Sequence, residues 1–562
     1  MTPDAPTRAE PARAPERLPA VTWLGLAAGF VAVSLWLAWP HIDGEFLSDD
    51  YFYIVNNLYV HGLSWENVRE LLHPFGPPTI YTLNYAPVHL LLHAAQWEWV
   101  GDSTRLYHVS NAVGHGLASL LLVPFFLRAG IPAAAAVGGA ALFLVHPVNL
   151  EVIGWIFQLK TIVALALSLG ALMLHERRPA LAALLFALAL LTKVTALGIL
   201  PVVFVQAWIR SRREPAAPPH WGWIAGWVAI ALAVSIPEMT AFKRQDDVRI
   251  VIADDAWAHG RTIFAIAARY LWMALTGLGV ATFHEPPPAK SWLDPWWLAG
   301  LVALLAIGWR SLQTLLRGNE EACLWALAAA SFLPVSQIFP FIFPMGDRYL
   351  YAILPGLIGA MILALLPAWK RGLAALEPPQ REVARRVAGI AVLGICVLFA
   401  LRTHERAAVF ATNLAMMTDS ALSYPDGMQA HLLRGHRAAG EGNALAAARA
   451  YDRAIELGFS DLQALLTNPH LERVRGQPPF RPVLQKLARL DIQRLGQHED
   501  PEQSELIRIA IAQELLGDPQ AAMDALVRAR SAPGPFAKEL ERRIGILARL
   551  YGVRPRAATP AP

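Results

Sequence analysis

The chain has 562 residues, of which 55% are hydrophobic and only 16% are charged, and this balance excludes a string of ordinary water-soluble domains. Its formal charge is +4, from 48 Lys and Arg residues against 44 Asp and Glu, which is too small to indicate a nucleic-acid partner. Cys323 and Cys396 both lie in apolar runs, so neither a disulfide framework nor a cysteine-based metal site is expected.

Eleven apolar stretches predict membrane-spanning helices, which need about 20 mainly apolar residues each. The first, Val21 to Pro40, follows a basic segment (residues 1–20) and is too long and uninterrupted for the core of a cleaved signal peptide. The other ten lie near residues 106–127, 132–148, 160–175, 179–193, 196–210, 221–238, 295–310, 320–336, 349–368 and 387–402. The sequence therefore predicts an all-α fold with a polytopic membrane helix bundle over residues 21–402.

The basic residues between these stretches predict the orientation of the bundle. Threading the spans alternately through the bilayer gathers most of them on the side of residues 1–20, which the positive-inside rule makes cytoplasmic. This threading requires the semi-apolar stretches 84–100 and 263–283 to lie in the outer interface as amphipathic helices. Two long loops, 41–105 and 239–294, are then outside. Since the composition rich in Ala, Arg and Pro suggests a bacterial chain, we expect the inner membrane and a periplasmic outer side.

Residues 403–562 are more charged and show helical periodicity, so they are predicted to form a soluble helical domain on the outer side. Small and aromatic residues there have the spacing of a tetratricopeptide helix pair: Gly435, Gly442, Ala447, Tyr451 and Ala454. A second set, from Ala510 to Ala529, repeats part of the pattern and fits an ordinary helical hairpin equally well.

Two adjacent carboxylates, Asp49 and Asp50, follow the first predicted span in an aromatic segment. Where water is scarce, a carboxylate can act as a base toward a hydroxyl, and its neighbour can position a substrate or a divalent metal ion. From spacing alone, a helix cap for the segment beginning near Tyr51 is an equally good interpretation.

Three basic residues lie at the predicted outer ends of spans, where the positive-inside rule predicts few of them: Lys160, Lys193 and Arg348. Each needs a compensating anion, since a cation within the membrane costs roughly 2.5 to 3.5 kcal/mol. That anion is either an internal carboxylate, such as Glu151 or Asp347, or the phosphate of a lipid-linked substrate. Supporting residues on the same face are expected at His146, where Pro147 ends a helix, and at Tyr349.

Taken in order, these motifs resemble the transmembrane-and-tetratricopeptide O-mannosyltransferases of the GT-C superfamily. The resemblance is carried by the acidic pair ahead of Ile54-Val55-Asn56-Asn57, by Tyr107-His108-Val109-Ser110-Asn111 with His115, by His146-Pro147-Val148 with Glu151, by Leu191-Thr192-Lys193, and by Asp347-Arg348-Tyr349-Leu350-Tyr351. The chain departs from the family at Phe157-Gln158-Leu159-Lys160 and at Val194, which puts the donor sugar or the acceptor in doubt.

The resemblance implies an inverting membrane glycosyltransferase that moves a sugar from a polyprenyl-phosphate carrier to an extracytoplasmic acceptor, for which a protein Ser or Thr hydroxyl is one candidate. It implies that Asp49 or Asp50 is the catalytic base. It also implies a donor phosphate, which Arg348, Lys160 and Lys193 are expected to bind. A divalent metal at the acidic pair stays open.

Two other functions also stay open. A transporter or lipid flippase would need buried charges near the middle of the membrane and a repeat between the halves of the bundle. A non-catalytic scaffold would need only its tetratricopeptide-like tail. No phosphate-cradling Walker A sequence is present, so nucleotide hydrolysis is not expected.

Overall fold

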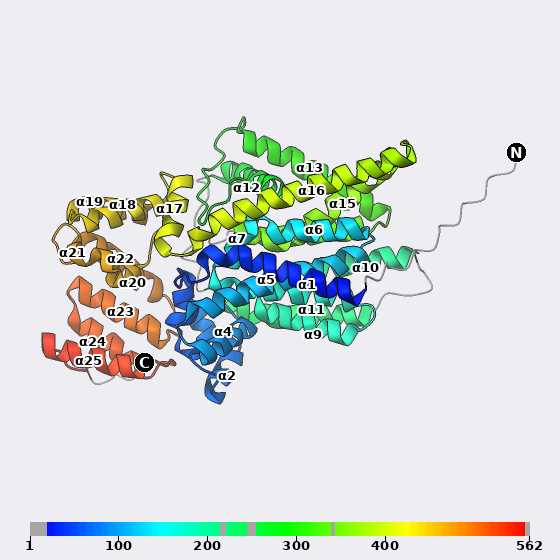
Figure 1. Cartoon of the computed structure of the whole chain (residues 1–562). Coiled ribbons are helices and arrows are strands. Elements are labelled where there is room, and N and C mark those ends of the chain that lie inside the picture. Colours follow the sequence, from blue (N-terminus) through cyan, green and yellow to red (C-terminus); the bar gives the residue numbers. More distant parts are fainter. Residues whose placement is uncertain (1–18, 214–220, 244–254, 339–342, 499, 557–562) are drawn as a thin grey trace.

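The computed structural model describes residues 19–213, 221–243, 255–338, 343–498 and 500–556, and within these ranges the regular elements are all helices. The predicted basic segment 1–20 falls almost wholly outside them, as does part of the loop predicted at 239–294. Figure 1 shows a bundle of long helices with a smaller helical tail beyond one end of it. The predicted all-α fold is confirmed.

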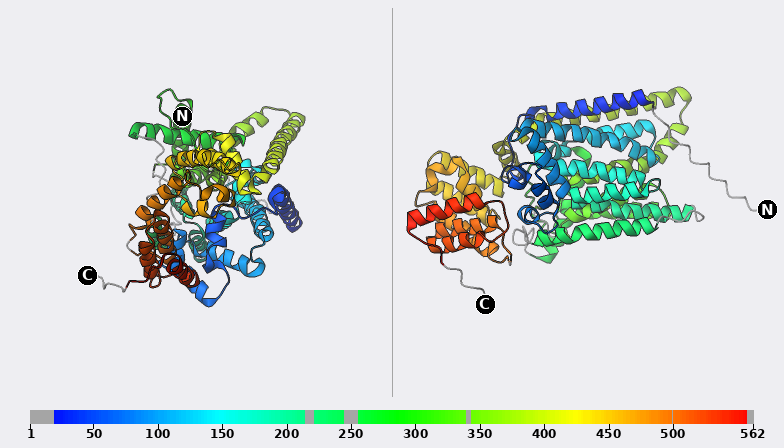
Figure 2. Two further views of the ribbon diagram at one scale, coloured as in Figure 1. Left: turned by 90° about the vertical axis from the view of Figure 1, so that its left-hand side faces the viewer. Right: turned by 90° about the horizontal axis from the view of Figure 1, so that it is seen from below.

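The bundle consists of thirteen helices in the described residues, and most of them run roughly side by side (Figure 2). Their bounds are α1 (Ala20–Ala38), α5 (Thr104–Arg128), α6 (Ala133–Val145), α7 (Leu150–Gly154), α8 (Leu159–Leu174), α9 (Pro179–Thr192), α10 (Leu200–Arg213), α11 (Trp221–Lys243), α12 (Ala256–Thr276), α13 (Pro295–Leu316), α14 (Glu321–Phe332), α15 (Leu350–Ala374) and α16 (Pro378–Arg406).

Eight helical segments of the described chain are long and apolar enough to cross a membrane, and the polytopic prediction is confirmed to that extent. A ninth arises if α6 and the helical turns after it, which bend by 51°, form one broken span. The spans predicted at 179–193 and 320–336 coincide with shorter apolar helices, so the count of eleven stays a prediction for these two. Neither α12 nor α4 (Pro87–Val100), which occupy the two stretches predicted to be amphipathic, is among the eight.

Helix breaks bring polar residues to the end of the bundle that faces the tail, here called the tail-side end. Helix α6 stops at Val145, and the predicted stop at Pro147 is confirmed because this proline starts a separate turn that leads into α7. Helix α9 likewise ends at Thr192, and Lys193 continues in an extended conformation. The short helices of the first long loop, α2 (Trp65–Leu72), α3 (Pro77–Thr82) and α4, lie at the same end (Figure 1).

The tail has hydrophobic cores of its own. Its helices are α17 (Asn413–Ser423), α18 (Met428–Gly440), α19 (Ala444–Glu456), α20 (Leu462–Thr467), α21 (Glu472–Arg475), α22 (Arg481–Leu495), α23 (Gln503–Leu516), α24 (Pro519–Ala529) and α25 (Ala537–Tyr551). In the first predicted pair, α18 and α19, Gly435 lies against the Tyr451 ring so closely that a Cβ atom there would stand 2.7 Å from a ring carbon. Small residues do allow the close helix approach that was predicted, while membership of the tetratricopeptide class stays a prediction.

Candidate functional site

The three cations singled out in the sequence come together at the tail-side end of the bundle. Lys160 lies in the first turn of α8, Lys193 follows α9, and Arg348 precedes α15. Their positive charges are near enough to repel one another. A cluster of like charges in a largely apolar surrounding is costly unless an anion joins it.

Asp49 supplies negative charge to this cluster without touching it. Its half-buried carboxylate is attracted by Arg348 and by Lys160. Among the described residues, however, no hydrogen bond or ion pair to this carboxylate is formed. Burial raises the pKa of the Asp49 carboxyl above its ordinary value, and the two cations act in the opposite direction.

Lys160 is the counterpart of Asp49, since it too makes no hydrogen bond or ion pair with the described residues. The side chain is buried, and its Nζ lies 4.5 Å from the ring centroids of both Tyr53 and Phe157. Within the described residues, it makes cation–π contacts but neither a hydrogen bond nor an ion pair. Asp49 and Lys160 thus attract each other without a direct bond, and both keep the capacity to bind a polar ligand.

Asp50 has a different, structural role. One of its oxygens accepts a hydrogen bond from the backbone N–H of Leu47 (2.8 Å), and the other accepts one from Phe157 N–H (2.8 Å). Trp155 Nε1 also donates to the Leu47 carbonyl (3.1 Å). The interpretation of Asp50 as a helix cap is wrong, because its side chain holds residues before and far beyond the turn at Tyr51. It ties the first long loop to the segment before α8.

Arg348 has its compensating anion inside the protein. Its guanidinium Nη1 donates to Glu151 Oε1, and its backbone N–H donates to Glu151 Oε2 (2.7 Å). Of the two anions considered for this cation, the internal carboxylate is therefore present. Nη2 donates to Tyr349 Oη (3.3 Å), and the guanidinium carbon lies 4.8 Å from the Tyr349 ring centroid.

Asp347 and His146 are engaged elsewhere. Asp347 Oδ1 is bonded to His284 Nε2 at 2.7 Å, and the other ring nitrogen of His284 is 3.0 Å from Tyr424 Oη in the tail. His146 Nε2 is 3.0 Å from the carbonyl oxygen of Ala274, and its Nδ1 accepts from Val148 N–H (3.4 Å). His146 therefore joins α12 to the break after α6 and does not reach the cations.

Lys193 opens onto a cavity of about 600 Å³, a volume that includes the part open to the outside. Its Nζ donates to Thr161 Oγ1 (2.7 Å), and Arg348 and Tyr349 stand beside it at the polar end. The remaining walls are mostly small or apolar and come from α8, from the segment after α9, and from α14 and α15: Ala164, Leu165, Ser168, Ala196, Gly198, Ile199, Leu327, Ser331, Val335 and Ala352. A cavity that is cationic at one end and apolar beyond suits a molecule with a charged head and a hydrocarbon tail.

The acidic pair is a poor divalent-metal site. Both Asp50 oxygens are taken by backbone N–H groups, which leaves Asp49 as the one available carboxylate of the pair. Calcium and magnesium ions require several oxygen ligands. The described residues contain no group of three or more His, Cys, Asp or Glu side chains placed to hold a metal ion.

Two residues near the site, Tyr53 and Glu238, were missed by sequence reasoning. Tyr53 follows Asp49 by four residues, one helical turn on, and its ring lies beside Lys160. Buried Glu238 on α11 accepts a hydrogen bond from Tyr85 N–H (2.6 Å) and attracts Lys160. His89 on α4 is buried with its ring centroid 5.7 Å from that of Tyr53. A lone carboxylate at the end of the apolar run 221–238 was the available signal for Glu238.

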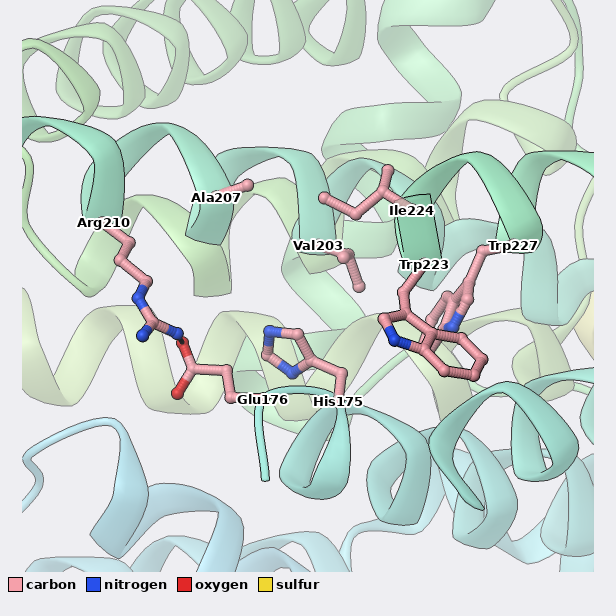
Figure 3. A pocket seen from close by; sticks show the side chains of 8 residues that line it. All are labelled: His175, Glu176, Val203, Ala207, Arg210, Trp223, Ile224 and Trp227. Carbon is pink, nitrogen blue, oxygen red and sulfur yellow. Dashed lines mark ion pairs between the residues drawn. The ribbon is translucent and has the colours of Figure 1, made fainter. Parts of the chain in front are cut away.

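A second cavity, of about 400 Å³, lies at the far end of the bundle, away from the tail. Figure 3 shows it between the side chains of Trp223 and Trp227 on one side and the ion pair of Glu176 with Arg210 on the other. Glu176 is 3.5 Å from Arg210 and 3.7 Å from Arg128, so its charge is already balanced. The far end therefore differs from the tail-side end, where Asp49 and Lys160 make no ion pair with the residues that the structure describes.

Comparison with protein-family models and with curated proteins finds no match. Among solved structures, the crystal structure of ArnT from Cupriavidus metallidurans bound to undecaprenyl phosphate aligns with 92% of this chain and 82% of its own. The aligned residues are 13% identical and the TM-score is 0.36. A likeness at this level assigns no role to a residue of this chain, so the function must be argued from the site.

Proposed function

We propose that this chain is an integral-membrane glycosyltransferase of the GT-C type, which transfers a sugar from a polyprenyl-phosphate donor to an extracytoplasmic acceptor. The observation that carries the proposal is the Asp49 carboxylate, which makes no hydrogen bond or ion pair with the described residues and is attracted by Arg348 and Lys160. Arg348 also lines the cavity that is cationic at one end and apolar beyond. A transporter or flippase would need comparable charges near the middle of the membrane. The charges that support the present proposal gather at one end.

The proposed reaction is a single displacement with inversion. The acceptor hydroxyl oxygen forms a bond to the anomeric carbon while the bond from that carbon to the phosphate oxygen breaks. Asp49 takes the hydroxyl proton, since it is the carboxylate of the pair that is free of hydrogen bonds to the described residues. The leaving lipid phosphate gains negative charge beside Lys193, Arg348 and Lys160, and fixed cations stabilise that charge without reorganising.

The lipid portion of the donor is proposed to occupy the cavity beyond Lys193. A cation that is already paired with Glu151 can still receive a phosphate, because a guanidinium carries five N–H donors and Glu151 Oε1 takes one of those of Arg348.

The orientation and the acceptor complete the proposal. Basic residues at the far end favour that side as cytoplasmic, which puts Asp49 and the tail in the extracytoplasmic space. Stacked helix pairs form surfaces that bind peptides, so the tail is proposed to hold a polypeptide whose Ser or Thr hydroxyl accepts the sugar, as in the O-mannosyltransferases.

The proposal is tested with the purified full chain in lipid nanodiscs and two donors, undecaprenyl-phosphate-linked mannose and undecaprenyl-phosphate-linked glucose. A Ser- and Thr-rich peptide serves as acceptor. We expect release of undecaprenyl phosphate together with labelled peptide from at least one donor. Equal release by wild type and by an Asp49→Asn variant would contradict the proposal.

The pH dependence of transfer should report Asp49. The base must be ionised, so activity falls as the pH drops through its raised pKa. In Lys160→Met, a positive charge that lowers this pKa is gone, and the acid limb of the profile of kcat/KM should therefore move to higher pH. An acid limb at the same pH in wild type and variant would show that Asp49 does not set it.

Narrowing the cavity should weaken donor binding. Ala352 lines it from α15, and Ala352→Phe is expected to raise the KM of the donor about tenfold, because the phenyl ring fills space that the lipid portion is proposed to occupy. Leu365→Phe on the exposed face of the same helix is the matched control. The lipid assignment fails if both variants keep the wild-type KM.

A further inference from the structure

The first helix of the tail, α17, is hydrogen-bonded to the residues that directly precede Asp49. Asn413, at the start of α17, accepts a hydrogen bond at Oδ1 from Ser48 N–H (2.9 Å). Its Nδ2 donates to the Phe46 carbonyl (3.0 Å) and to Glu45 Oε1 (3.0 Å), and its backbone N–H donates to Glu45 Oε1 (2.6 Å). One asparagine of the tail therefore makes four hydrogen bonds to three residues of the first long loop, Glu45, Phe46 and Ser48.

The residue held by Asn413 has an unusual backbone conformation. Ser48 has φ +39°, in the left-handed region that residues other than glycine seldom adopt. Such conformations persist only where the surroundings impose them, and they concentrate at functional sites. Asp49 is the next residue, so the conformation of Ser48 sets the direction in which its carboxylate leaves the chain.

The same helix also holds the segment after α12, which contacts the residue before Arg348. Asp419 Oδ2 accepts from Thr282 N–H (3.0 Å), and Ser420 Oγ donates to the Phe283 carbonyl (2.9 Å). The neighbouring His284 is bonded to Asp347, which directly precedes Arg348. Helix α17 is itself fixed to α16 through the two-point ion pair of Arg406 with Asp419 (2.9 and 3.1 Å). It therefore contacts the loop that carries Asp49 directly, and it reaches the residue before Arg348 through the segment 282–284.

We propose that Asn413 is a positioning residue: it holds Ser48 in the left-handed conformation and thereby aims Asp49 at the space in front of Lys160 and Arg348. The inference rests on the proposed function for its catalytic consequence. Tail helix α17 is then part of the transferase site and not only a support for the acceptor.

The expected effect is on turnover and not on donor binding. Asn413 reaches neither the cations nor the cavity, so Asn413→Ala should leave the KM of the donor unchanged while kcat falls about tenfold or more, as displacement of a catalytic group does. Glycine adopts positive φ without steric cost. Adding Ser48→Gly to Asn413→Ala should therefore recover most of the lost kcat. Leu422→Ala, on the exposed side of α17, is the control and should match the wild type.

A second measurement does not depend on activity. Hydrogen–deuterium exchange of full-length protein in nanodiscs should show faster exchange over residues 44–50 in Asn413→Ala than in wild type or Leu422→Ala. Unchanged exchange there would overturn the positioning role. A fall in kcat that Ser48→Gly does not recover would overturn the conformational mechanism. If the wild type turns over no donor, yet residues 44–50 exchange faster in Asn413→Ala, the positioning of Ser48 by Asn413 is supported and the proposed function fails.

Discussion

Asp49→Asn is expected to lower the rate of sugar transfer by about 10²- to 10⁴-fold, the usual contribution of a general base. Asparagine has the size of aspartate but does not accept the acceptor's proton. The Asp49 carboxylate makes no hydrogen bond or ion pair with the described residues, and its burial raises its pKa, so its charge is not needed for folding. The variant should therefore insert and melt like the wild type while donor turnover is lost.

Asp50→Asn provides the internal comparison. Both carboxylate oxygens of Asp50 accept backbone hydrogen bonds, and an asparagine would set its NH₂ group against the N–H of Leu47 or Phe157. We expect a loss of about 1–3 kcal/mol in stability, the cost of a buried donor left without an acceptor. A reversed outcome, with turnover kept in Asp49→Asn and abolished in a well-folded Asp50→Asn, would assign the base to Asp50.

Arg348→Gln should impair both stability and catalysis. Glu151 is almost fully buried and is bonded to the Arg348 guanidinium and backbone, so removal of the guanidinium leaves a buried carboxylate without its counter-ion. The free energy of unfolding is expected to fall by about 3–5 kcal/mol. The loss of one fixed charge near the leaving phosphate should lower kcat by about 10²- to 10³-fold as well.

The double variant Glu151→Gln with Arg348→Gln separates these two effects. Neutralising both members removes the unpaired buried charge, so thermal stability in nanodiscs should return toward that of the wild type. Transfer should stay as low as in Arg348→Gln alone. If activity returned together with stability, the role of Arg348 would be limited to neutralising Glu151.

Sequence reasoning located the bundle and the cations well because both depend on local composition. Apolar runs identify spans by length, and a basic residue at the predicted outer end of a span departs from the positive-inside rule clearly enough to be noticed as a single residue. This is why Lys160, Lys193 and Arg348 could be grouped before their positions were known. The stop at Pro147 has an equally local cause, the missing backbone N–H of proline.

Pairing between distant residues was not accessible in this way. The acidic pair gave no sign of which member would be tied to Phe157, and the sequence left two anions open for Arg348. Glu238 was hidden at the end of an apolar run. The hydrogen bond from Ser48 to Asn413 joins residues that lie 365 positions apart. The positive φ of Ser48 has no sequence signature either.

The distance along the chain between Ser48 and Asn413 also has a consequence for biosynthesis. At roughly 5–20 residues per second, about 20–70 s separate the synthesis of these two residues. Throughout that interval the first loop is already made but lacks the amide that fixes it. A nascent chain that ends before Asn413 would accordingly reach the membrane with Ser48 and Asp49 not yet fixed. On the proposed function, consumption of the lipid-linked sugar would begin only after α17 has been synthesised and has folded against the bundle.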